Sequence, residues 1–246
     1  MQIVSALFSD WTFLFTLAGS ALLIYAAANR TAPPRQLLLL AVLLPALFIA
    51  GGLANHAVTR CTPRTLDSAF LRIDGGVSTA IYHWISRRPG WRLPVNLVYC
   101  GLPVFAAFVL CTSPRRMLCA TVLLAASAVA PIFYWLFPAT GPAHLGSAVA
   151  ARNCMPSLHM TWALLLAWYS NPRIRTAAWI FAGLTAFVTL ATGEHYWIDL
   201  VAAVVYSACF VALGVRLKGR FLRPADDGEG PSASWGRDGA RGAERA

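Results

Sequence analysis

Residues 176–215 read TAAWIFAGLTAFVTLATGEHYWIDLVAAVVYSACFVALGV. Two apolar runs, residues 176–192 and 197–215, are separated here by only four residues. Each run approaches the roughly 20 apolar residues that an α-helix needs to cross a bilayer. The short connection therefore predicts a tight hairpin of two membrane-spanning helices.

Five more apolar runs precede this hairpin, at residues 11–29, 36–55, 93–111, 117–137 and 157–170. The 246-residue chain is 58% hydrophobic and only 12% charged, about half of the roughly 25% charged residues found in soluble domains. We therefore predict an all-α fold, a polytopic transmembrane helical bundle of six to seven spans. The bundle occupies residues 1–217 as one unit, and the polar remainder, residues 218–246, is expected to be a disordered cytoplasmic tail.

Basic side chains concentrate on one side of this bundle. They lie in alternate connections and after the last span, at Arg30, Arg35, Arg115, Arg116, Arg173, Arg175 and Arg216. The positive-inside rule makes that side cytoplasmic, together with the carboxyl terminus. The connection at 193–196 then faces the exoplasmic side, which is periplasmic or lumenal. This topology accounts for the net charge of +10, so the expected partner is a membrane and not a nucleic acid.

The long connection at residues 56–92 carries several arginines on the predicted exoplasmic side. Its apolar residues recur at near-helical spacing, at Phe70, Ile73, Val77, Ile81 and Trp84. The pattern predicts an interfacial amphipathic helix that is interrupted at Gly75 and Gly76. Such a helix can form a platform or lid over a lipid headgroup, or it can simply pack on the bundle.

Two polar clusters stand at the amino ends of apolar runs on the predicted exoplasmic side. One has the sequence PSLH and ends at His159, and the other, HYWID, extends from His195 to Asp199. Ionisable side chains at a bilayer edge are costly, so they indicate a functional site. The run at 157–170, whose first turn contains His159, makes about 21 Å of helix, against a hydrocarbon core of about 30 Å. We therefore expect His159 in a recess that is lined by protein or water.

The residue types in these clusters favour phosphoryl chemistry without a metal. His195 and Asp199 are four residues apart, so they share one helix face. A carboxylate on one ring nitrogen fixes the tautomer and raises the basicity of the other, as a nucleophilic histidine requires. Ser157 is a natural N-cap, backbone N–H groups at both helix starts can bind an anion, and His159 can protonate a leaving group. The alternative is a zinc ion held by the two histidines and Asp199.

The two clusters resemble the PSxH and HxxxD motifs of the type-2 phosphatidic acid phosphatase superfamily. The resemblance covers residues 117–217, and the order of the motifs and the 36-residue spacing of the histidines also fit. It implies a phosphatidic acid phosphatase-like helical core with the site near one membrane face. It further implies that His195 is the nucleophile that forms a phosphohistidine, that Asp199 orients it, and that His159 is the general acid. No metal and no cofactor are implied, and the substrate is a phospholipid or a lipid phosphate.

Two basic motifs that are usual in the phosphatases of this superfamily are replaced here. Val188 and Thr189 stand in the place of a Ser-Arg pair, and residues 137–144, FPATGPAH, stand in the place of a motif with Lys and Arg-Pro. This replacement and the sequence TGEHY at 192–196 are similar to the inositol phosphorylceramide synthase branch. Members of that branch transfer a phospho-headgroup between lipids.

A site with few cations favours a donor with less charge than a phosphate monoester, such as a phosphodiester. Arg152 and His144 are the cations expected to bind phosphate here, together with Ser157. The predicted function is a metal-independent lipid phosphatase or phosphotransferase, with a preference for headgroup transfer of the inositol phosphorylceramide synthase type. The alternatives are a hydrolase of lipid phosphates or polyprenyl diphosphates, and a non-catalytic membrane transporter or scaffold.

Six cysteines are present. Four of them lie in apolar runs, where they are expected to pack as small core residues. Cys61 and Cys154 fall in loops on the same predicted side of the membrane, and they form either a disulfide or two free thiols.

Overall fold

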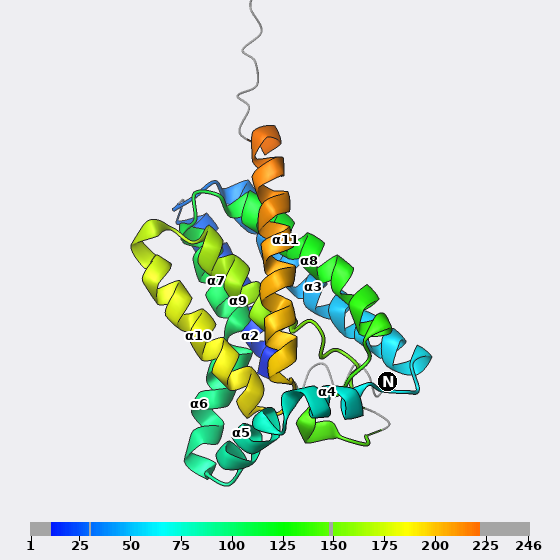
Figure 1. The fold of residues 1–246 in the computed structure, drawn as a ribbon. Helices are drawn as coiled ribbons and strands as arrows, with labels where there is room; N and C mark the ends of the chain where they lie inside the picture. Colours follow the sequence, from blue (N-terminus) through cyan, green and yellow to red (C-terminus); the bar gives the residue numbers. More distant parts are fainter. Residues whose placement is uncertain (1–10, 30, 148–149, 222–246) are drawn as a thin grey trace, which may run out of the picture.

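The computed structural model describes residues 11–29, 31–147 and 150–221, and every regular element in these ranges is helical (Figure 1). The α-helices are α2 (Trp11–Ala28), α3 (Pro34–Cys61), α4 (Asp67–Asp74), α5 (Val77–Ser86), α6 (Pro89–Cys100), α7 (Leu102–Thr112), α8 (Arg116–Leu136), α9 (Leu158–Tyr169), α10 (Arg175–Ala191) and α11 (Trp197–Phe221). Two short 3-10 helices, η1 (Pro142–His144) and η2 (Pro172–Ile174), lie in the connections. The predicted all-α fold is confirmed.

Within the described ranges, five helical segments are long and apolar enough to cross a membrane: α2, α3, α8, α10 together with η2, and α11 as far as Leu217. A sixth candidate is formed by α6 and α7, which meet at a 42° bend. These helices confirm the predicted multi-pass membrane bundle. By contrast, α9 has only 12 residues, or about 18 Å of helix. The apolar run at 157–170 is therefore a short internal helix, and it packs against α8, α10 and α11.

Small residues pack among larger ones in the interior of the bundle. Ala106, Ala126 and Ala163 are fully buried among α7, α8 and α9. Small side chains let helix backbones approach closely, which favours helix association inside a bilayer. Other apolar side chains point outward from the bundle, and Val42 and Val205 are 67% and 62% exposed. Apolar residues thus occupy both the inner and the outer faces of the long helices, as a lipid surrounding requires.

The predicted interrupted helix in the long connection is confirmed as α4 and α5. Gly75 and Gly76 separate them with φ angles of 61° and 81°, a left-handed conformation that glycine adopts without strain. The buried side chains differ from the expectation, because Asp67 and Asp74 are buried whereas Ile73 is 57% exposed. The two carboxylates therefore face the protein.

α4, α5 and η1 lie across one end of the bundle, beside the connection between α10 and α11 (Figure 1). The carboxyl end of α11 lies at the opposite end. The connection between α10 and α11 thus lies at the other end of the bundle from the end of α11, as the predicted orientation requires. Which end is exoplasmic and which is cytoplasmic stays a prediction. Of the predicted tail at 218–246, residues 222–246 lie outside the described ranges.

Candidate active site

Carboxylates hold the first turn of α11. The Oδ2 atom of Asp199 accepts the backbone N–H of Tyr196 at 2.8 Å, which is one half of a capping box. The next backbone N–H, that of Trp197, donates to Asp74 Oδ1 at 3.2 Å and to Ser78 Oγ at 2.9 Å. Two of the N–H groups that we expected to be free for a phosphate at this helix start are therefore already bonded.

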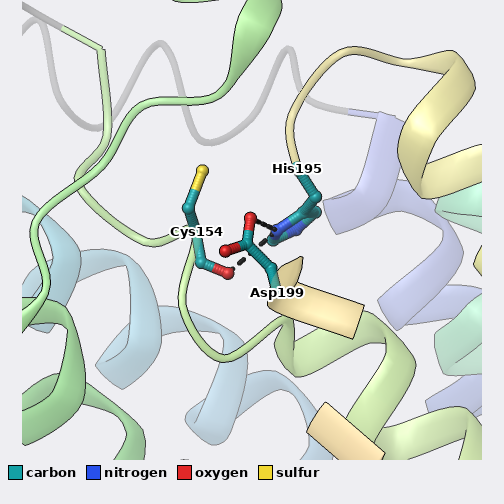
Figure 2. A group of neighbouring side chains, drawn as sticks. All are labelled: Cys154, His195 and Asp199. Carbon is teal, nitrogen blue, oxygen red and sulfur yellow. Dashed lines mark hydrogen bonds and ion pairs between the residues drawn. The ribbon is translucent and has the colours of Figure 1, made fainter. Parts of the chain in front are cut away.

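His195 is buried beside Asp199, as the four-residue spacing predicts (Figure 2). Its Nδ1 lies 2.9 Å from the backbone carbonyl oxygen of Cys154 and 3.6 Å from Asp199 Oδ2. Because both neighbours are acceptors, Nδ1 carries a proton and donates it to the Cys154 carbonyl. In the neutral form of this tautomer, Nε2 carries the lone pair. The orienting group that lies nearer to the ring is a backbone carbonyl, which the sequence did not reveal.

The loop before α9 joins the two clusters. The backbone N–H of Ser157 donates to the Asp199 carbonyl at 3.4 Å, and the Cys154 thiol donates to the Glu194 carbonyl at 2.8 Å. Ser157 is the N-cap of α9, as predicted, because its Oγ accepts the Met160 N–H at 3.4 Å. These bonds connect the starts of α9 and α11, so the clusters meet as the sequence argument requires.

His159 lies in the first turn of α9 and stacks on Tyr99 of α6. The ring centroids are 4.0 Å apart and the planes differ by 19°, so the stack fixes the plane of the imidazole. Among the described residues, none forms a hydrogen bond with the ring nitrogens of His159 or with the backbone N–H groups of Leu158 and His159. The positive end of the α9 dipole therefore presents donors that a ligand can use.

His159 and His195 line the same cavity, which has a volume of about 720 Å³. Most of its wall is apolar and includes Leu44, Leu47, Phe48, Leu124, Pro131 and Trp162. Asn153 and Glu194 line it together with the two histidines. The part of the wall that the described residues form contains no Lys or Arg. These four residues, Asn153, His159, Glu194 and His195, are called the polar end of the cavity below, and the rest of the wall is mainly apolar.

An ion pair places Glu194 at this polar end. His144 Nε2 lies 3.0 Å from Glu194 Oε1, and the two side chains retain 41% and 37% exposure. The hydrogen bond to Glu194 raises the pKa of His144, although partial burial opposes this shift. Burial acts to raise the pKa of Glu194, but the hydrogen bond and the charge of His144 outweigh it, so that pKa is lowered. The cavity wall therefore carries an ionised carboxylate.

Arg152, the expected phosphate-binding cation, lies outside the cavity wall. It is buried, and its guanidinium donates from Nε to the Thr62 carbonyl and from Nη1 to the Ser147 carbonyl, both at 3.3 Å. Its backbone N–H donates to Thr59 Oγ1 at 3.3 Å. These bonds tie the loop before α9 to the end of α3. A phosphate-binding role for Arg152 stays a prediction.

Asp67 and Asp74, for which no role was predicted, accept hydrogen bonds from the loops around the site. Oδ1 of Asp67 accepts the N–H groups of Thr140 and Gly141 at 2.9 and 3.2 Å and the hydroxyl of Tyr196 at 3.1 Å. Oδ2 accepts the Thr140 hydroxyl at 3.0 Å. One signal could have found them: only five acidic residues precede residue 225, and two of these lie in one loop.

Two glycines allow the loop at 138–144 to pack against residues 193–194, which directly precede the HYWID segment. Gly141 and Gly193 have φ angles of 85° and 74°. A Cβ atom on Gly193 would lie 2.6 Å from Ala143 Cβ and 2.8 Å from Tyr82 Cδ2. The Ala143 N–H donates to the Gly193 carbonyl at 2.9 Å across this contact. A larger residue at 193 would separate the two loops.

Cys154, His195 and Asp199 offer potential metal ligands whose atoms lie within 4.8 Å of one another (Figure 2). Nδ1 of His195 is bonded to a carbonyl, and burial raises the pKa of the Cys154 thiol well above its usual value, which keeps it protonated. A metal bound at Nδ1 and at this thiol would have to displace both arrangements, and the expected absence of a metal stays a prediction. Cys154 is also a free thiol, as is the exposed Cys61.

Comparison with known proteins gives one family match. The sequence model of the PAP2 superfamily matches residues 143–213, which include both histidines of the cavity, Asp199, Ser157, Arg152 and His144. No curated protein and no solved structure gives a significant match. The match agrees with the resemblance seen in the motifs and supports a lipid phosphatase type of activity. It applies to the superfamily as a whole and carries nothing specific to inositol phosphorylceramide synthases.

Proposed function

We propose that this protein is a membrane-embedded lipid phosphatase or phosphotransferase that acts through a phosphohistidine on His195. The observation that carries the proposal is the placement of His195 and His159 on the wall of one largely apolar cavity. The Cys154 carbonyl and Asp199 hold the nucleophile with its Nε2 lone pair free. An apolar chamber with a few convergent polar groups suits a lipid whose phosphate reaches the two histidines.

In the proposed reaction, Nε2 of His195 attacks phosphorus and the bond from phosphorus to the leaving oxygen breaks. His159 donates a proton to that oxygen, and an alcohol departs from the phosphohistidine. Water or a second alcohol then attacks phosphorus and gives its proton to His159, which frees His195. Asp199 stabilises the positive charge that His195 gains, and the start of α9 with Ser157 supplies donors to the phosphate oxygens. These steps require no metal.

The charge of the cavity favours transfer of a phospho-headgroup, as in the inositol phosphorylceramide synthase branch. Glu194 lines the wall, and the described residues add no Lys or Arg to it. A singly charged phosphodiester meets less repulsion there than a doubly charged monoester. Hydrolysis of lipid phosphates or polyprenyl diphosphates is the second candidate, and the superfamily match supports it. We place the site on the exoplasmic side and the carboxyl terminus in the cytoplasm.

The test is an assay of purified protein in detergent with EDTA present. A panel of lipid phosphates, diphosphates and phosphodiesters is supplied with and without an alcohol acceptor, and release of phosphate and transfer of the headgroup are both measured. We expect His195→Ala and His159→Ala to abolish turnover. His83→Ala is the matched control, because His83 is exposed and outside this cavity.

The outcomes separate the candidate functions. Phosphate release in EDTA that both site variants abolish supports the hydrolase, whereas acceptor-dependent transfer supports the transferase. A chain that retains its cellular function in His195→Ala would be a non-catalytic transporter or scaffold, and the proposed function would be wrong.

A further inference from the structure

The charge at the polar end of the cavity is unusual for a site that binds phosphate. Glu194 directly precedes His195, and both residues line the same cavity. Its partner His144 lies outside the cavity wall. Within residues 11–29, 31–147 and 150–221, no Lys or Arg contributes to that wall. A phosphate at His195 therefore meets a carboxylate that no guanidinium or ammonium group of the described wall offsets.

Coulomb repulsion is proportional to the product of the two charges. Near neutral pH a phosphate monoester carries between about 1.5 and 2 negative charges, whereas a diester carries one. The carboxylate thus repels a monoester almost twice as strongly. The apolar wall does little to screen this repulsion, whereas the 37% exposure of the Glu194 side chain and the adjacent His144 reduce it. The resulting discrimination is on the order of tenfold.

We propose that Glu194 is a specificity-determining residue that makes the site select singly charged phosphodiester lipids over doubly charged phosphate monoesters. This inference rests on the proposed function, since it names the substrate class of the same site. Glu194 acts through its charge and forms no bond to the reacting atoms. Its carboxylate also offers an acceptor to a hydroxyl or ammonium group on the headgroup of a diester.

Dioleoyl phosphatidic acid and its monomethyl ester are suitable donors for the test, because they differ by one methyl group and one ionisable oxygen. Attack at phosphorus with loss of the glyceride oxygen releases diacylglycerol from both, so one assay gives kcat/KM for each. The variants are Glu194→Gln and His144→Gln. Both break the same ion pair, but the first removes a negative charge and the second removes a positive charge.

We expect the ratio of kcat/KM for the diester to that for the monoester to fall about tenfold in Glu194→Gln and to rise about threefold in His144→Gln. A purely structural role of the pair would move the ratio in the same direction in both variants. That result, or an unchanged ratio in Glu194→Gln, would overturn the inference.

A binding measurement separates this inference from the proposed function. The non-hydrolysable phosphonate analogues of the two donors are titrated, and the fluorescence of Trp162, which lines the cavity, is followed in a variant that retains only this tryptophan. The affinity ratio of the analogues should shift in the same opposite directions in the two variants. A wild-type protein that neither binds the analogues nor turns over either donor would overturn the proposed function, and the selectivity with it.

Discussion

Substitution of Asp67 by alanine should strongly destabilise the site end of the bundle. Asp67 is 4% exposed, and its carboxylate accepts four hydrogen bonds, from two backbone N–H groups and two hydroxyls. A hydrogen bond to a charged group contributes about 1.5–3 kcal/mol. Water can reach loops at the end of the bundle and bond to some of the four donors that lose their acceptor. We therefore expect the free energy of unfolding to fall by about 4 kcal/mol.

One of these four bonds comes from the Tyr196 hydroxyl, at 3.1 Å. Tyr196→Phe removes that donor alone, so we expect a loss of about 1.5 kcal/mol. In a protein that already carries Asp67→Ala, the same substitution should cost almost nothing, because the acceptor is absent. The coupling energy between the two positions is then also about 1.5 kcal/mol.

The assay is thermal unfolding in detergent, followed by tryptophan fluorescence at several scan rates. For a chain of this size each kcal/mol shifts the midpoint by about 2–4 °C, so Asp67→Ala should lower it by roughly 8–16 °C. Ser68→Ala is the control, because Ser68 is the exposed neighbour on α4. A loss below about 1 kcal/mol for Asp67→Ala, or additive effects of the two substitutions, would refute the reasoning.

Three further predictions concern separate features of the molecule. The pKa of His144 is raised, so its ion pair with Glu194 stops stabilising the fold as the pH rises through the pKa of His144. The pKa of Glu194 is lowered, so the stabilisation is also lost as the pH falls through the pKa of Glu194. The difference in unfolding midpoint between the wild type and His144→Gln should be largest between pH 4.5 and pH 6.5, the ordinary pKa values of a glutamate and a histidine, and should vanish at high pH. A difference that grows with pH would contradict this. Gly193→Ala should lower the free energy of unfolding by about 2 kcal/mol and reduce turnover, because Gly193 has a positive φ and a Cβ there would meet close neighbours. The control is Gly183→Ala, which should not destabilise, because a Cβ at that position would meet nothing within 4 Å. Equal unfolding midpoints for the two variants would contradict this prediction. The exposed Cys61, in a variant without the other cysteines, should react with an impermeant maleimide outside intact cells; labelling only after permeabilisation would reverse the predicted orientation.

Most of the secondary structure was predictable from local patterns. A bilayer demands long apolar helices with internally satisfied backbones, so apolar runs such as 117–137 and 197–215 mark their own positions. The break at Gly75 and Gly76 was also readable, because only glycine adopts a positive φ freely. The spacing of His195 and Asp199 predicted their contact on one helix face, and the contact forms although α11 begins only at Trp197.

The remainder of the site could not be predicted, because its contacts join segments that are distant in the chain. Every residue has a backbone carbonyl, so nothing in the sequence marks that of Cys154 as the acceptor for His195. Nothing in the sequence around Asp67 indicates whether its carboxylate faces water or is buried and accepts four hydrogen bonds. Arg152 illustrates the same limit, since its spacing from the PSLH cluster suggested phosphate and its bonds join two loops.

The membrane-bundle class and the proposed partnership of His195 and Asp199 therefore follow from the order of residues along the chain, because they depend on hydrophobic runs and on a four-residue spacing. The electrostatic character of the cavity depends on which side chains from α9 and from the connection before α11 converge. Glu194, and no guanidinium group of the described residues, stands on the wall beside His195. That arrangement arises only when the helices pack, because packing alone sets which charges share one low-dielectric space.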